Sequence, residues 1–118
     1  VEMIRKVALF AFNGEAMCFV HVLLNALDMQ ARGYEVKVVL EGSATKLANE
    51  LNDPDKPFGK LYLKVRDAGL IDCACRACSG TMGALEGMQA QGRPLCDEMA
   101  GHPSVARYME AGYEIVTF

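Results

Sequence analysis

The chain has 118 residues, of which 52% are hydrophobic and 23% are charged, and its formal net charge is −3. This length supports one hydrophobic core and the composition is too apolar for disorder, so we predict a single domain over residues 1–118. The lysines and arginines are scattered, which excludes the concentrated basic face of a nucleic-acid-binding protein. No apolar run reaches the ~18–20 residues that a membrane-spanning helix needs.

The N-terminus and the cysteines favour a cytoplasmic location. The first six residues are charged and lack the apolar region and cleavage site of a signal peptide. Translation that starts at Met3, with Val1 and Glu2 added in front, is one interpretation that the sequence leaves open. An odd count of five cysteines without export signals favours a reducing compartment. The cysteines are therefore predicted to be free thiols or ligands rather than bridges.

The first strand and helix are predicted from an apolar run at 6–12 and a helical pattern over 15–32. A continuous apolar run is typical of a strand buried in a parallel sheet. Asn13, in the turn between them, is predicted to cap the helix, which ends at Gly33. This helix is apolar around most of its circumference, which indicates burial on two faces and hence an oligomer.

The middle of the chain repeats the alternation of strand and helix. Ser43 is predicted as the N-cap of the second helix, and Gly69 ends the third. The predicted elements are a strand at 34–40, a helix at 44–51, a helix at 58–68 and a short buried strand at 70–73.

The last third of the chain carries a weaker pattern. Residues 79–91 have a helical period but contain three glycines, each costing ~1 kcal/mol relative to alanine. These glycines indicate either close approach of a backbone or ligand, or loose packing. Residues 93–99 are predicted as a fourth strand or an extended edge. Pro103 is predicted at the first position of the last helix, before a closing strand at 114–118.

Strands that alternate with helices predict an α/β fold with a doubly wound, mainly parallel sheet of about five strands flanked by helices. In such sheets, functional groups gather beyond the carboxyl ends of the strands. The turns after the predicted strands therefore mark the edge where a site is expected.

Three of the five cysteines, Cys73, Cys75 and Cys78, lie within six residues at the end of the third predicted strand. Cys75 and Cys78 form a C-x-x-C motif, which is found in redox dithiols, zinc half-sites and sulfur-relay pairs. Arg76 and the start of the following helix are predicted to stabilise a thiolate there. Cys73, on the strand, is predicted to be a buried side chain.

A second motif, C-x-x-H, lies on the first predicted helix at Cys18 and His21. If the first and third strands were neighbours, this pair would join Cys75 and Cys78 in a four-ligand zinc site. The same spacing also arises by chance in an apolar helix. In that case His21 is a partly buried side chain paired with Asn25 or the backbone.

Glu15 and His102 are candidate proton-handling groups, because both are predicted to lie near the carboxyl edge of the sheet. The start of a helix disfavours a protonated imidazole, which suits His102 to this role. The alternative interpretation of His102 is a helix-capping residue before a proline. No glycine-rich nucleotide-binding pattern is present, so no cofactor is expected.

The chain resembles the DsrE/DsrF-like family, the small cytoplasmic sulfur carriers that include the TusD-type subunits. The resemblance rests on the strands at 6–12 and 34–40, the long apolar helix, the thiol junction after the third strand, and the ending at 112–118. The reactive cysteine of this family follows the third strand, with a glycine about two helical turns further on. Cys75, with Gly83, matches that register.

The resemblance implies a doubly wound fold and assembly as trimers, hexamers or heterohexamers. It further implies a cysteine persulfide that is received from a donor protein and passed to an acceptor protein by thiolate attack. On this prediction Cys75 carries the sulfur, Cys78 is a second acceptor or a resolving thiol, and Arg76 stabilises the thiolate. The alternatives are a zinc- or small-ligand-binding oligomer subunit that uses the same cysteines, and a structural subunit with inert thiols.

Overall fold

The computed structural model describes residues 4–118, which contain five strands and six helices. The strands are β1 (Lys6–Ala11), β2 (Glu35–Leu40), β3 (Ile71–Cys75), β4 (Leu95–Cys96) and β5 (Glu114–Thr117). The helices are α1 (Ala16–Ala31), α2 (Ala44–Glu50), α3 (Gly59–Asp67), α4 (Arg76–Thr81), α5 (Leu85–Ala90) and α6 (Val105–Glu110). Val1, Glu2 and Met3, and with them the question of the start at Met3, lie outside the described residues.

The five strands form one sheet in the order β4-β3-β2-β1-β5, and every neighbouring pair is parallel. This confirms the predicted α/β class and the strand number. Because β2 lies between β1 and β3, the first and third strands are not neighbours. The carboxyl ends of all five strands lie at the same edge of the sheet, where the site was expected.

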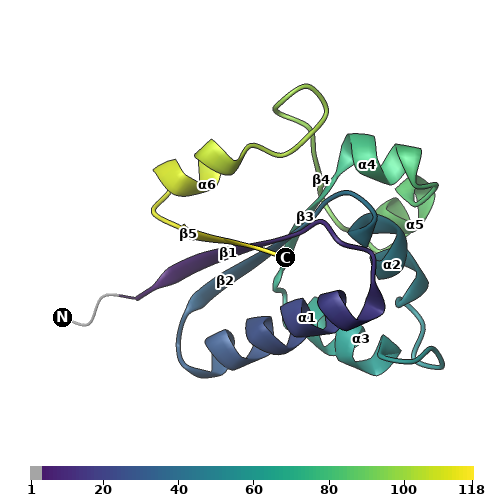
Figure 1. Ribbon diagram of the computed structural model, residues 1–118, viewed down its shortest axis with the longest axis horizontal. Coiled ribbons are helices and arrows are strands. Elements are labelled where there is room, and N and C mark those ends of the chain that lie inside the picture. The colour runs from purple at the N-terminus through teal and green to yellow at the C-terminus, as the bar shows by residue number, and fades with distance from the viewer. Residues whose placement is uncertain (1–3) are drawn as a thin grey trace.

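Helices cover both faces of the sheet, with α1 and α3 on one side and α6 on the other (Figure 1). Alternate residues of β1 divide between the two cores: Val7 and Leu9 belong to the larger, Ala8 and Phe10 to the smaller. The smaller core is closed by Tyr108 of α6, whose ring meets that of Phe10 edge-on at 5.3 Å between centroids. Within residues 4–118, no helix combines the length and apolarity needed to cross a bilayer.

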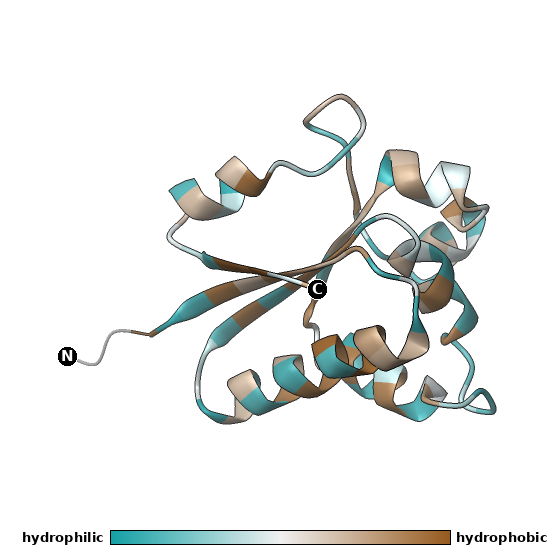
Figure 2. Cartoon of the chain, in the orientation of Figure 1, coloured by the Kyte–Doolittle hydropathy of each residue, from teal (hydrophilic) through white to brown (hydrophobic). Residues whose placement is uncertain are grey.

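The long helix α1 alternates between hydrophobic and hydrophilic residues along its length (Figure 2). Phe19, Val22, Leu23 and Ala26 form its buried stripe. Met17 and Leu24 are exposed apolar side chains on the same helix. The helix therefore buries one face on the sheet and leaves apolar side chains on the other.

Of the two N-caps predicted in the first half of the chain, Ser43 lies at the N-cap position of α2, whereas Asn13 lies before α1, whose N-cap is Glu15. The Asn13 side chain accepts the N–H of Glu15 at 2.8 Å, which closes a local turn before α1 begins. The Ser43 hydroxyl makes no capping hydrogen bond to α2 but accepts the N–H of Gly14 at 2.8 Å. A Cβ on Gly14 would lie 2.7 Å from the Ser43 carbonyl oxygen, so the two turns are packed directly together.

The predicted helix at 79–91 is interrupted, because Gly83 adopts a positive φ of 70° that separates α4 from α5. Gly87 instead allows close packing, since a Cβ there would lie 1.6 Å from the Asn49 side-chain oxygen. The predicted start of the last helix is also shifted. Ser104 is the N-cap of α6 and accepts the N–H of Arg107, so Pro103 precedes the helix.

Candidate functional site

The junction between β3 and α4 brings two free thiols together. Cys75 is the last residue of β3 and also the N-cap of α4, and its sulfur accepts the backbone N–H of Cys78 at 3.4 Å. Cys78 lies one helical turn further along and is half-buried. The C-x-x-C motif thus forms the first turn of a helix that starts at the carboxyl edge of the sheet.

A tight turn after β4 brings His102 to the same place. Met99 and His102 exchange backbone hydrogen bonds of 2.8 and 3.0 Å across the two residues between them. Those two residues, Ala100 and Gly101, have φ values of 51° and 92°, as a type I′ hairpin turn requires. The Gly101 carbonyl accepts the N–H of Ala77 at 2.9 Å, which fixes the turn against α4.

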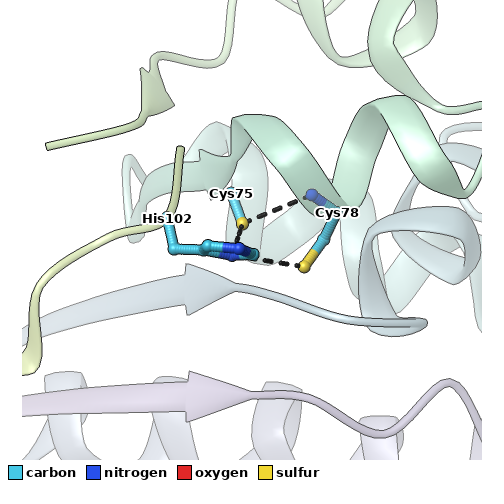
Figure 3. Close-up of side chains that lie close together, drawn as sticks. All are labelled: Cys75, Cys78 and His102. Atoms are coloured by element: carbon cyan, nitrogen blue, oxygen red, sulfur yellow. Dashed lines mark hydrogen bonds between the residues drawn. The ribbon is translucent and has the colours of Figure 1, made fainter. Parts of the chain in front are cut away.

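The imidazole of His102 faces both thiols (Figure 3). Its Nδ1 atom lies 3.0 Å from the Cys75 sulfur and 3.8 Å from the Cys78 sulfur. Over residues 4–118, these three side chains are the one group of three potential metal ligands whose ligand atoms all lie within 4.8 Å of each other. His102 is therefore part of the site, although it belongs to a turn and not to the start of a helix.

Cys75 does not have the accessible, acidic thiol that the sequence predicts. Its exposed fraction is 0%, and burial raises the pKa of its thiol to about 12. The hydrogen bond from Cys78 opposes this rise in pKa, while the nearby Cys78 thiol and the Glu41 carboxylate add to it. Arg76 is exposed, and none of the hydrogen bonds or ion pairs among residues 4–118 involves its guanidinium.

Glu41 is a site residue that the sequence reasoning missed. It directly follows β2, next to β3, and only 6% of it is exposed. Burial raises the pKa of its carboxyl to about 7, and its negative charge raises the pKa of the Cys75 thiol. A carboxylate at the end of an apolar strand was the available signal. The turn after this strand was expected at the functional edge, but Glu41 was not singled out there.

Cys18, His21 and Glu15 lie at the start of α1 and do not join this group. The Cys18 thiol is 3.9 Å from a Glu15 carboxylate oxygen. The alternative interpretation of His21 is also wrong, because its side chain is exposed rather than partly buried, and Asn25 donates to the His21 backbone carbonyl and not to the imidazole. The predicted four-ligand set depended on β1 and β3 being neighbours, and β2 separates them.

The remaining two cysteines, Cys73 and Cys96, form a disulfide, so the prediction that the chain has no bridges is wrong. Cys73 is buried as expected, in the smaller core beside Tyr108. The bridge forms because β3 and β4 are neighbours and place these side chains on the same face. The cysteine count therefore no longer indicates a reducing compartment, and the cytoplasmic location stays a prediction.

No family model matches the chain. The chain is similar to the uncharacterized protein MJ0733 of Methanocaldococcus jannaschii, with 31% identity over 96 residues, which cover 81% of this chain and 76% of MJ0733. It belongs to the same family as MJ0733. The chain is also similar to an uncharacterized protein of Archaeoglobus fulgidus, with 44% identity over 43 residues, which cover 36% of this chain and 70% of that protein.

The fold is shared with a solved structure, that of the conserved protein of unknown function BT1422 from Bacteroides thetaiotaomicron. The TM-score is 0.73 with 18% sequence identity, and the match covers 96% of this chain and 94% of BT1422. At this identity the likeness concerns the fold alone. The names of these proteins state no activity, so the function must be argued from the site.

Proposed function

We propose that this chain is a sulfur carrier of the DsrE/DsrF type that holds sulfur as a persulfide on the thiol pair at the β3–α4 junction. The observation that carries the proposal is a half-buried thiol, Cys78, beside a second free thiol and an imidazole nitrogen. A carrier needs a thiol that a donor can reach and a group that takes the thiol proton. Cys78 meets the first requirement and His102 the second.

In the proposed reaction, Cys78 rather than Cys75 receives the sulfur, because Cys75 has no exposed surface. His102 Nδ1, 3.8 Å away, takes the Cys78 proton. The thiolate then attacks the outer sulfur of a donor persulfide. A sulfur–sulfur bond forms on Cys78 as that of the donor breaks, and the electron pair leaves with the donor thiolate. The donor persulfide is reduced to a thiol as Cys78 is oxidised to a persulfide, so the donor supplies the oxidising equivalent and no further oxidant is needed.

Release follows the same chemistry in reverse. A nucleophile on the acceptor attacks the outer sulfur, and Cys78 leaves as a thiolate. Cys75 keeps its proton and positions the imidazole, with its sulfur 3.0 Å from Nδ1. The donor and acceptor proteins, and the trimer or hexamer expected for this family, belong to the same proposal. Exposed Met17 and Leu24 on α1 are consistent with contacts between copies.

The test is to load the reduced protein with inorganic polysulfide, block the thiols with iodoacetamide, and locate added sulfur by peptide mass spectrometry. Trypsin cleaves after Arg76, so Cys75 and Cys78 lie in different backbone segments, and fragment ions distinguish Cys78 from Cys96, which share a segment because trypsin does not cleave between Arg93 and Pro94. We expect one added sulfur on Cys78, loss of loading in Cys78→Ser, and unchanged loading in Cys18→Ser. Sulfur that remains on the chain at the wild-type level in Cys78→Ser would contradict the proposal.

A further inference from the structure

The geometry points to a second property of this chain: Cys75, Cys78 and His102 form a binding site for Zn²⁺ with an open fourth position. The site requires only that both thiols are reduced, so it stands whether or not Cys78 also carries sulfur. It differs from the set expected from the sequence, because His102 takes the place of Cys18 and His21.

The two distances between the imidazole nitrogen and the sulfur atoms are close to those that a tetrahedral zinc ion requires. Zinc–sulfur bonds of about 2.3 Å and zinc–nitrogen bonds of about 2.0 Å put neighbouring sulfur and nitrogen ligands about 3.5 Å apart. Nδ1 of His102 lies 3.0 Å from one sulfur and 3.8 Å from the other, on either side of that value. Movements of about half an ångström therefore bring both nitrogen–sulfur distances to that value.

The chemistry of the donor set selects zinc over harder ions. Two thiolates and one imidazole suit zinc, whereas calcium and magnesium prefer oxygen ligands. Binding releases the two thiol protons and leaves the histidine neutral, with Nδ1 coordinated. Three protein ligands leave one tetrahedral position for water or an added ligand, as in zinc sites that act on small molecules.

Surrounding contacts hold the ligands in place and leave a path for the ion. The N–H of Cys78 donates to the Cys75 sulfur, which stabilises a metal-bound thiolate. The bond between Ala77 and the Gly101 carbonyl holds the histidine turn against α4. Cys75 is buried, while Cys78 and His102 are half-buried, so the ion enters from their side.

The test is a titration of the metal-free protein, with the Cys73–Cys96 bridge intact and Cys75 and Cys78 free, with Co²⁺, whose visible spectrum reports tetrahedral coordination and sulfur ligands, followed by displacement with Zn²⁺. We expect one Co²⁺ per chain. The Cys78→Ser and His102→Ala variants should each bind at least about a hundredfold more weakly. The Cys18→Ser/His21→Ala double variant is the matched control, because it removes the other cysteine–histidine pair, and it should bind like the wild type.

Three results would overturn the inference: no tetrahedral spectrum in the wild type, an unchanged affinity in His102→Ala, or a loss of binding in the Cys18→Ser/His21→Ala variant. Circular dichroism of each variant confirms that it is folded. The titration uses unloaded protein, so it is independent of persulfide formation. Metal binding without sulfur loading would contradict only the sulfur-carrier proposal, and the reverse result only the zinc site.

Discussion

Cys73 and Cys75 lie two residues apart on β3, and each belongs to a pair of cysteines. The pair Cys73–Cys96 is a disulfide, whereas Cys75 and Cys78 are free thiols. Cys73 lies in the smaller core beneath α6 and is bonded to Cys96. Cys75 ends the strand, and its neighbours are a free thiol and an imidazole. The difference teaches that the place of a cysteine along the strand, and the element packed against it, decide its state. The local sequence does not decide it, because it is nearly the same around Cys73 and Cys75.

The disulfide also helps to position the histidine that lies beside the free thiols. Cys96 belongs to β4, a strand of two residues, and the turn that presents His102 follows directly after it. The disulfide fastens this short strand to β3, where pairing covers only Ala74 with Leu95 and Cys75 with Cys96. The bonded pair therefore supports the histidine on which the free pair depends.

The largest expected effect concerns the bonded pair. Replacing both residues, Cys73→Ala/Cys96→Ala, should lower the free energy of unfolding by about 3 kcal/mol, because the bridge closes a loop with a sequence separation of 23. The half-buried free thiol is the control, and Cys78→Ala should cost less than about 1 kcal/mol. Guanidinium unfolding at one pH measures both. Equal losses in the two variants would show that the bridge contributes no stability of its own.

The next largest effect concerns Glu41, the buried carboxyl near the free thiol of Cys75. Burial raises the pKa of Glu41 to about 7, so the folded chain holds this proton more tightly than the unfolded chain. The resulting stability is complete below the ordinary carboxyl pKa of about 4.5 and is lost as the pH rises through about 7. Glu41→Gln should remove this loss, so its free energy of unfolding at pH 8 should be higher than that of the wild type by roughly 2 kcal/mol.

Urea unfolding at pH 5 and pH 8 measures that difference. The exposed Glu50, on α2, provides the control. Glu50→Gln should follow the wild type at both pH values. A Glu41→Gln variant whose advantage is the same at pH 5 and pH 8 would contradict a buried, proton-holding carboxyl.

The smallest effect concerns the turn at 99–102, which lies between Cys96 of the disulfide and His102 of the site. Ala100 has a φ of 51°, which is unfavourable for a residue with a side chain, so Ala100→Gly should raise stability by about 0.5 kcal/mol. The same change at exposed Ala106, inside α6, should lower stability by about 1 kcal/mol. Thermal unfolding of both variants gives the two signs. A loss of stability in Ala100→Gly would mean that the turn is not strained.

The α/β class and the strands of the first half could be predicted, because buried parallel strands and capped helices leave periodic patterns. The fourth strand predicted within 93–99 is present as β4, but its two residues carry no pattern that shows which strand it pairs with, so the Cys73–Cys96 bridge could not be found. Predicting that bridge requires knowing that β4 pairs with β3. That pairing is set by the packing of the whole sheet.

The candidate site was predicted in part. The sequence placed Cys75 and Cys78 at a strand–helix junction on the functional edge, and the structure has them there. It named His102, but for the wrong local structure. It assigned an accessible thiolate to Cys75, whose burial follows from neighbours that no spacing rule describes. Glu41 was missed because its role depends on proximity to β3.

The central claim is that the cysteines divide into a bonded pair and a free, unequal pair, and thiol counting tests it most directly. With a chromogenic disulfide reagent, unfolded and unreduced protein should show three reactive thiols, those of Cys18, Cys75 and Cys78. After reduction all five cysteines should react. In the folded Cys18→Ser variant, Cys78 should react at least about tenfold faster than buried Cys75. Five thiols without reduction, or equal rates for Cys75 and Cys78, would contradict the account.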